Sequence, residues 1–335
     1  MELLSALEQN TLVNLGLLAC SVLLLWKGSD WLIEGASGIG RALGMSDLTV
    51  GLTIVAFGTS APEFAVTVSA ALTEHSDISV GNIVGSNIFN IGFILGGCAA
   101  VRALQTTAGV IWRDGALLVL TSVLLVVILQ DQHLSRLDGG ILFLGLCGYI
   151  VLLWKTRFVR EDRTGFIDYF RSWRGARARA AEEEDDEPIR GRDVLWVLLG
   201  LAAVVGGGHL LVQSASNIAR QYGISEWTIA VTIVAAGTSA PELATSLVAA
   251  TKGRMGISLG NLIGSDLFNL LGVLGVAGLI RPLGITADSL SSLYMLVGMC
   301  LLAVVLLRTS WRLGRLEGLL LVAVGLARWT WDFLG

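Results

Sequence analysis

Two copies of one hexapeptide bring together residues that could bind a cation inside a membrane. The sequence GTSAPE occurs at Gly58–Glu63 and again at Gly237–Glu242, each time within a strongly apolar stretch. Proline has no backbone donor and disrupts a helix, so nearby main-chain carbonyl groups lose their partners. Inside a bilayer such groups must be satisfied by something else. Freed carbonyls followed directly by a glutamate therefore predict a site for a bound cation.

The glutamates themselves need a partner of opposite charge. A carboxylate near the bilayer centre costs about 2.5–3.5 kcal/mol on insertion scales. Neither hexapeptide contains Lys or Arg, which favours a bound ion over a salt bridge. Helical spacing also predicts that each glutamate shares a face with the threonine and serine before it: Thr59, Ser60 and Glu63 in one copy, and Thr238, Ser239 and Glu242 in the other.

A polar stripe with a spacing of four residues follows each hexapeptide. The stripes are Asn82, Ser86 and Asn90, then Asn261, Ser265 and Asn269. Oxygen and amide ligands without thiolate or imidazole suit hard cations such as Na⁺ and Ca²⁺. Two carboxylates would neutralise one Ca²⁺ or two Na⁺. Any single Ser, Thr or Asn here could instead serve helix packing, so the two glutamates are the strongest candidates.

Ten apolar segments must position these residues. They lie at about 11–33, 46–71, 79–101, 114–130, 138–155, 193–216, 225–250, 258–280, 288–307 and 316–334. Segments near 20 residues can cross the hydrocarbon core. The chain is 54% hydrophobic and 15% charged, below the roughly one quarter charged residues of soluble domains. We therefore expect an all-α polytopic membrane protein with ten transmembrane helices, of which the second and seventh are broken.

The two halves of the chain repeat each other. A shift of 179 residues aligns 36–96 with 215–275 without a gap, and about half of the positions are identical. Five segments per half make the repeats opposite in orientation, an arrangement typical of transporters with a site near the midplane. The predicted organisation is a first half at 1–155, a linker at 156–192 and a second half at 193–335. The linker is expected to be solvated, with an interfacial basic helix as the alternative.

Lysine and arginine residues predict the orientation in the membrane. They concentrate in the connections after the odd-numbered segments and in the linker, and such residues mark cytoplasmic loops. We expect a plasma-membrane protein, the inner membrane in a bacterium, with both termini outside and a cytoplasmic linker.

The paired motifs resemble a known family. GTSAPE followed by GN(I/L)(V/I)GS(N/D)(I/L)FN, in both halves, is similar to the α-repeats of the sodium/calcium exchanger family within the cation/calcium antiporter superfamily. The resemblance implies antiport by alternating access, in which segments 1 and 6 move against the remaining bundle.

The resemblance also implies roles for individual residues. It assigns Ca²⁺ to Glu63, Glu242 and the carbonyl groups of Thr59 and Thr238. For Na⁺ it implies the Ala56 and Ala235 carbonyl groups and the same threonines and glutamates, together with four serines: Ser60, Ser86, Ser239 and Ser265. Asn90 and Asn269 would flank the centre.

Two positions depart from this pattern. Several relatives carry Asp where this chain has Asn269, so the resemblance argues against potassium dependence and leaves the central Na⁺ or proton site open. Asp266 replaces the counterpart of Asn87 and has no role assigned by the motif.

Exchange of Na⁺ for Ca²⁺, driving Ca²⁺ extrusion, is the predicted function, and Ca²⁺/H⁺ exchange through the same two glutamates is the alternative. A cation channel is disfavoured by the inverted repeats. An intramembrane hydrolase is disfavoured because Ser60 and Ser239 lack a G-x-S-x-G turn. We expect no enzyme activity and no cofactor. The expected partners are small inorganic cations and the lipid bilayer, without nucleic acid, and we expect the protein to function as a monomer.

Overall fold

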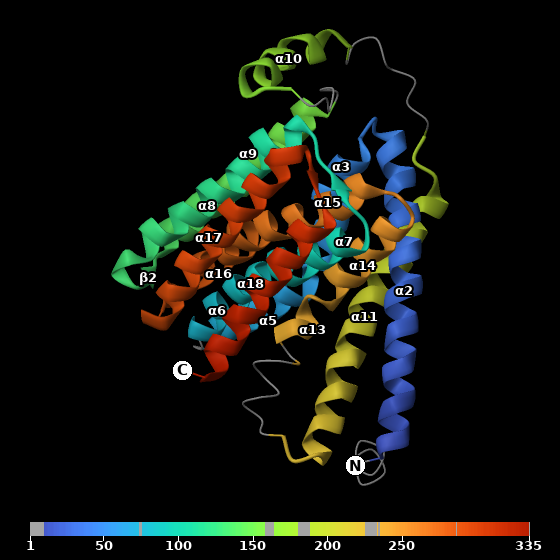
Figure 1. Cartoon of the computed structure of the whole chain (residues 1–335), viewed down its shortest axis with the longest axis vertical. Helices are drawn as coiled ribbons and strands as arrows, with labels where there is room; N and C mark the ends of the chain where they lie inside the picture. The colour runs from blue at the N-terminus through green and yellow to red at the C-terminus, as the bar shows by residue number, and fades with distance from the viewer. Residues whose placement is uncertain are drawn as a thin grey trace.

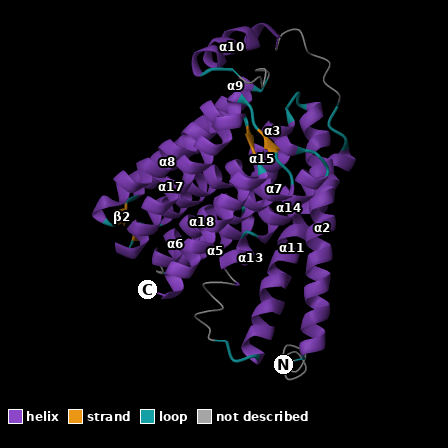
Figure 2. Cartoon of the chain, in the orientation of Figure 1, coloured by secondary structure: helices purple, strands orange, loops and turns teal. Residues whose placement is uncertain are grey.

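The computed structural model describes the chain in seven ranges of residues, 10–73, 76–157, 164–179, 188–224, 233, 235–285 and 287–334. Almost all of these residues are helical, and the few extended residues form two short strand pairs (Figure 2). Many large apolar side chains, such as Leu12, Leu120 and Leu144, lie exposed on the outer helices. Such a surface suits lipid rather than water. The prediction of an all-α polytopic membrane protein is confirmed.

The first half begins with a long helix and continues through shorter, interrupted ones. Its helices are α2 (Thr11–Ala42), α3 (Asp47–Val50), α4 (Ala56–Thr59), α5 (Ala61–Leu72), α6 (Ser76–Phe89), α7 (Gly96–Val101), α8 (Ala116–Ile128) and α9 (Arg136–Thr156). Wider π-helical turns continue them at η1 (Gly51–Val55), η2 (Asn90–Leu95) and η3 (Val110–Gly115), and a 3₁₀ turn, η4 (Leu129–Asp131), ends α8. Wide turns of this kind often occur at functional sites.

The second half follows the same order. Its elements are α11 (Gly191–Gln221), α13 (Ala235–Thr238), α14 (Ala240–Thr251), α15 (Met255–Leu267), the π-helical turn η6 (Phe268–Val273), α16 (Leu274–Ile280), α17 (Ala287–Ser310) and α18 (Arg315–Leu334). Within the described ranges, seven helices are long and apolar enough to cross a membrane, or eight with the bent pair of α3–α4 and α5. The seventh predicted segment begins in residues outside those ranges, and α18 carries several charges. The count of ten stays a prediction.

Both hexapeptides interrupt their helices at the serine before the alanine and proline. Ser60 has φ −79° and ψ 8°, Ser239 has φ −87° and ψ 7°, and proline occupies the first turn of the helix that follows each serine. Proline is tolerated in a first turn, where its missing donor would be unpaired in any case. In the first half the break bends the chain by 47°.

The long helices α2 and α11 pack closely along one side of the molecule (Figure 1). A Cβ atom added at Gly200 would lie 2.5 Å from the backbone nitrogen of Leu32, and one added at Gly28 would lie 2.7 Å from the Cβ atom of Ala203. Small residues such as these glycines let the backbones of two membrane helices approach each other closely. The two helices run antiparallel, because contacts that advance along α2 retreat along α11.

Two short strand pairs join the halves at their connecting loops. β1 (Leu104–Gln105) pairs with β4 (Arg312–Leu313), and β2 (His133–Leu134) pairs with β3 (Leu283–Gly284). A shift of 179 residues relates β1 to β3 and β2 to β4. Each half therefore supplies one strand to both pairs, as two units related by a pseudo-two-fold axis would.

The linker contains one described helix, α10 (Phe166–Arg179), which lies beyond the end of α9 (Figure 1). Its Tyr169 is buried in a small cluster with Ala108, next to Trp112 and Trp311. Trp112 donates a hydrogen bond to the main-chain oxygen of Thr164 at 3.1 Å. The linker thus contains a helix packed on the helical bundle, and both expectations for the linker, a solvated segment or an interfacial basic helix, stay predictions. Residues 158–163 and 180–187 of the predicted linker lie outside the described ranges.

Candidate cation-binding site

The two glutamates of the hexapeptides are both completely buried. Glu63 lies in the first turn of α5 and Glu242 in the first turn of α14, and each side chain has 0% of its surface exposed. Both follow the interruption at serine directly, so the broken helix fixes their position at the start of a new helix. The sequence prediction that these carboxylates lie inside the protein is supported by their burial.

Each carboxylate accepts a hydrogen bond from the serine of the other half. Ser60 donates to Oε1 of Glu242 at 3.1 Å, and Ser239 donates to Oε1 of Glu63 at 3.2 Å. The second oxygen of each glutamate, Oε2, is buried without a hydrogen-bond partner from the protein. The two halves therefore form one shared polar centre.

This crossing corrects the prediction that each serine shares a helical face with its own glutamate. That prediction assumed a continuous helix from Thr59 to Glu63, whereas the helix ends at Thr59 and restarts at Ala61. Ser60 lies at the break and reaches across to the opposite repeat. Sequence spacing alone could not reveal this, because the bend changes the direction in which the side chain points.

The threonines of the hexapeptides also contact the opposite half or its carboxylate. Thr59 donates to Oδ1 of Asn261 at 3.1 Å and lies 3.4 Å from the hydroxyl group of Ser265. The hydroxyl group of Thr238 interacts with Glu63. The carbonyl oxygen of Ala56 accepts the backbone N–H of Ser60 at 3.1 Å. Ala235 begins α13, so its main chain holds the corresponding place in the second half.

Asn82 and Asn261 hold the two broken helices in place. Asn82 donates to the Thr67 hydroxyl group at 3.1 Å and to the main-chain oxygen of Glu63 at 3.5 Å. Asn261 donates in the same way to Ser246 at 2.9 Å and to the main-chain oxygen of Glu242 at 3.5 Å. The sequence stripe included both asparagines but missed Thr67 and Ser246. Their signal was present as hydroxyl residues at equivalent positions of the two repeats.

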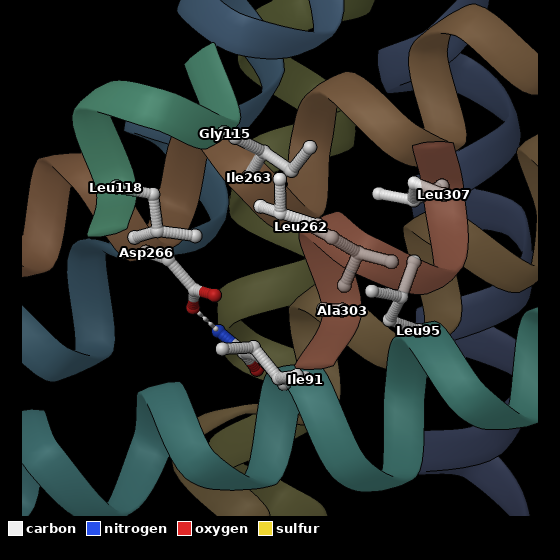
Figure 3. A pocket seen from close by; sticks show the side chains of 11 residues that line it. Ile91, Leu95, Gly115, Leu118, Leu262, Ile263, Asp266, Ala303 and Leu307 are labelled. Atoms are coloured by element: carbon white, nitrogen blue, oxygen red, sulfur yellow. Dashed lines mark hydrogen bonds between the residues drawn. The ribbon is translucent and has the colours of Figure 1, made fainter. Parts of the chain in front are cut away.

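A second set of crossed contacts lies one to two turns further along the stripes. Asn90 donates to Oδ1 of Asp266 at 3.0 Å, a bond drawn in Figure 3, and Asn269 donates to Oδ1 of Asn87 at 3.1 Å. Asn87 also donates to the main-chain oxygen of Asp266 at 3.0 Å. The oxygen atoms Oδ1 of Asn90, Oδ1 of Asn269 and Oγ of Ser86 are buried without a protein hydrogen bond.

The centre is thus rich in oxygen atoms that can accept and poor in groups that could neutralise them. Within the described ranges, neither Glu63 nor Glu242 forms an ion pair with Lys, Arg or His. Buried carboxylate oxygens without partners are expensive, and hard cations bind oxygen ligands of this kind. The arrangement can hold small hard cations and supplies two formal negative charges for them.

Comparison with known proteins places this site in context. The chain matches the sequence model of the family described as sodium/calcium exchanger protein over residues 13–155 and 193–324. It is 37% identical over 307 residues to "Putative antiporter CaxA" of Alkalimonas amylolytica, covering 90% of this chain and 92% of that protein. It is 33% identical over 337 residues to "Sodium/calcium exchanger MaX1" of Methanosarcina acetivorans, covering 92% and 95%. "Inner membrane protein YrbG" of Escherichia coli is 36% identical over 314 residues, covering 92% and 94%.

The fold also matches solved structures. A structure of the sodium-calcium exchanger NCX_Mj, soaked with zero Na⁺ and Ca²⁺, superposes with a TM-score of 0.79 at 29% sequence identity. The match covers 95% of this chain and 98% of that one. The likeness therefore extends beyond the two repeats to the whole arrangement of helices.

Proposed function

The chain belongs to the sodium/calcium exchanger family of antiporters, and from this premise we propose that it exchanges Na⁺ for Ca²⁺ and extrudes Ca²⁺ with the sodium gradient. The observation that carries the proposal is the crossed pair of carboxylates. Glu63 and Glu242 are buried, each bonded to the other half's serine through one oxygen and without a protein partner at the other. Two negative charges match one Ca²⁺ or two Na⁺, so the ions would compete for the same centre.

We assign Ca²⁺ to the two glutamates and to the main-chain carbonyls of Thr59 and Thr238. Ca²⁺ prefers about 6–8 oxygen ligands, and two bidentate carboxylates with two carbonyls come to about that number. The position of each threonine at the end of a helix supports this assignment. Na⁺ would use the carbonyls of Ala56 and Ala235, the two threonines, the glutamates and the serines Ser60, Ser86, Ser239 and Ser265. Asn90 and Asn269 would flank the centre.

Alternating access would come from movement of α2 and α11 against the remaining helices. The pair packs through glycine backbones along its own length, which supports its acting as one unit. The other helices are tied across the halves by the strand pairs and form the larger hydrophobic core. Small cations and the lipid bilayer are then the partners that the protein needs, and we propose that a single chain suffices for transport.

The protein is a multi-pass membrane protein, and we propose that it lies in the plasma membrane with the linker in the cytoplasm and both termini outside. The distribution of lysine and arginine supports this orientation. Labelling of single cysteines introduced at Arg171 and Thr11 with a membrane-impermeant maleimide in intact cells tests it. Labelling is expected at Thr11 alone, and labelling at Arg171 alone would reverse the orientation.

Ca²⁺/H⁺ exchange through the same glutamates is the second candidate. The neutral amide of Asn269 favours this candidate, because the polar stripe of the second half then adds no third carboxylate to Glu63 and Glu242. A sodium-driven cycle does not require that charge, because two carboxylates already balance two Na⁺.

Ion flux into proteoliposomes decides between the candidates. Vesicles loaded with Na⁺ and containing the purified protein are diluted into Na⁺-free buffer with radioactive Ca²⁺ at the same pH on both sides, with a proton ionophore present. Rapid Ca²⁺ uptake is expected. Uptake that appears only with a pH gradient, and not with a sodium gradient, would replace the first proposal with the second. Vesicles with Glu63→Gln protein serve as the control for leak.

A further inference from the structure

Four buried side chains form a hydrogen-bonded network that joins the two repeats. The network has pseudo-two-fold symmetry, but the residues differ at one pair of equivalent positions. Asn87 and Asp266 occupy equivalent positions of the two repeats, as do Asn90 and Asn269. Asn90 bonds to Asp266 at 3.0 Å and Asn269 bonds to Asn87 at 3.1 Å. All four residues are at most 2% exposed. The bond from Asn90 to Asp266 and the bond from Asn269 to Asn87 are therefore equivalent, while one uses a carboxylate acceptor where the other uses an amide acceptor.

An asparagine side chain has two ends with opposite chemistry. One is an oxygen that accepts hydrogen bonds and could bind a cation, and the other is an NH₂ group that donates and would repel one. Because the two ends have the same shape, the hydrogen-bond partners decide which end points where. For Asn90 and Asn269 this choice decides whether an oxygen or an NH₂ group is left free.

Asp266 fixes the choice for Asn90 through its side chain. Its carboxylate oxygen accepts, so the NH₂ group of Asn90 must point toward it. The Oδ1 atom of Asn90 is then left on the opposite side, buried and without a protein hydrogen bond. Asp266 and Asn90 both line a cavity of about 10 Å³, and the other lining residues that Figure 3 labels, such as Ile91 and Leu118, are apolar.

Asp266 fixes the choice for Asn269 through its main chain. The main-chain oxygen of Asp266 accepts the NH₂ group of Asn87, which turns Oδ1 of Asn87 toward Asn269. That oxygen accepts the NH₂ group of Asn269, and Oδ1 of Asn269 is again left buried without a protein partner. Both amides thus keep their oxygen atoms free because each chain of bonds ends on an acceptor belonging to Asp266.

We propose that Asp266 and Asn87 are positioning residues that orient the amides of Asn90 and Asn269, so that both present oxygen rather than NH₂ to the transported cations. The inference rests on the proposed function, in which these two amides flank the centre. Asp266 acts here as a hydrogen-bond acceptor and not as a cation ligand. The small and largely apolar cavity that Asp266 lines supports this role, because it has room for about one water molecule at most.

Two chemically minimal variants separate the acceptor role from a charge role. Asp266→Asn retains an oxygen that can accept from Asn90 but also gains an NH₂ group that can turn toward it, so the apparent Na⁺ and Ca²⁺ affinities are expected to fall by less than about tenfold, and by less than in Asp266→Leu. Asn90→Asp removes the donor and sets a carboxylate against Asp266, so the Na⁺ affinity should fall about tenfold or more. The double variant Asn90→Asp with Asp266→Asn restores one donor and one acceptor, and is expected to regain most of the lost affinity.

A double-mutant cycle tests the two independent branches of the network. Because the branch through Asn87 ends on the main chain of Asp266, Asp266→Leu should perturb Asn90 and leave Asn269 in place. Asp266→Leu is therefore expected to have no further effect in an Asn90→Leu background, but an additive effect in an Asn269→Leu background. Asn87→Leu, in contrast, should have no further effect in the Asn269→Leu background and an additive effect in the Asn90→Leu background. The readout is the KM for Na⁺ against the maximal rate of exchange in proteoliposomes, with gel filtration to confirm that each variant is folded.

Several outcomes would overturn the proposal. A loss in Asp266→Asn as large as that in Asp266→Leu would show that the negative charge itself is required, which makes Asp266 part of the ion site. If the double variant does not regain the affinity lost in Asn90→Asp, the donor–acceptor pairing of these two side chains is not what supports ion binding, and the proposal fails. If the original protein shows no sodium-dependent Ca²⁺ flux, the proposed function fails instead. The double-mutant cycle is then measured with the ion gradient that does drive Ca²⁺ exchange.

Discussion

At the centre of the bundle the two halves make matching contacts, whereas at the far ends of α5 and α14 they do not. Ser60 and Ser239 reach across to opposite glutamates at nearly equal distances. Near the far end of α14, Lys252 forms an ion pair with Asp30 of α2, and Arg254 contacts both Asp47 and the hydroxyl group of Ser37. In the other half the positions equivalent to Asp30 and Lys252 carry His209 and Thr73, and Thr73 bonds to its own helix.

This difference separates two requirements on an inverted repeat. In the proposed alternating-access cycle the central site would hold the same ions whichever side is open, so equal contacts from both halves suit it. In the proposed orientation the far ends of α5 and α14 would face different compartments, and there the halves are free to differ. Symmetry at the centre and asymmetry at the ends can each be tested by matched substitutions in the two repeats.

The largest effect is expected at the glutamates. Glu63→Gln and Glu242→Gln each remove one of two buried charges, and removing one partner of a buried ion pair costs about 3–5 kcal/mol. Ca²⁺ uptake into proteoliposomes should therefore fall at least about 100-fold in both variants. Equal losses would support the symmetry of the centre. Normal uptake in either variant, with intact folding by gel filtration, would contradict a shared site.

The glycine contact between α2 and α11 should give the next largest effect. Gly200→Ala places a Cβ atom 2.5 Å from the backbone of Leu32, and overpacking of this kind costs about 1–3 kcal/mol. Both the thermal midpoint of unfolding in detergent and the turnover rate should decrease. Gly206→Ala in the same helix is the matched control, because nothing lies within 4 Å of an added Cβ atom there. A similar decrease in both variants would argue against close packing as the cause.

A smaller and equal effect is expected from the two crossed serines. Ser60→Ala and Ser239→Ala each remove one hydrogen bond to a buried carboxylate, and such a bond contributes about 1.5 kcal/mol or more, so the apparent Na⁺ and Ca²⁺ affinities should fall about tenfold. Affinities can be measured from the ion dependence of exchange. Ser214→Ala is the control, because that hydroxyl group bonds to the main chain of its own helix. Unequal losses in Ser60→Ala and Ser239→Ala would break the symmetry of the centre.

The smallest effect is expected at the asymmetric end. Asp30→Asn removes an ion pair whose side chains are 28% and 42% exposed, and exposed pairs contribute about 0–1 kcal/mol. The ratio of the apparent Ca²⁺ affinities on the two sides of the membrane should change by up to about fivefold, without a change in maximal rate. Thr73→Ala in the other half should leave the ratio unchanged. An unchanged ratio in Asp30→Asn would show that this end does not bias the conformation.

The sequence was sufficient for the fold class and for the two carboxylates, because a proline and a glutamate in an apolar stretch have few physical explanations. It could not predict which serine bonds to which glutamate, since that depends on the bend at Ser60. It also did not assign Asn87 and Asp266, whose contacts join residues 179 positions apart. It also did not predict the buried cluster of Arg113, Asp114 and Tyr149, because Arg113 precedes the fourth predicted segment, in a connection where arginine is expected to be exposed.

The crossed hydrogen bonds have a consequence for the synthesis of the protein. Ser239 and Glu63 are 176 residues apart, and a ribosome adds about 5–20 residues per second. Glu63 is therefore made roughly 10–35 seconds before the serine that bonds it exists. During that interval the polar centre of the first half is incomplete. The carboxylate must stay hydrated or neutralised until the second half has been made, and the polar centre is complete only once the two repeats have docked.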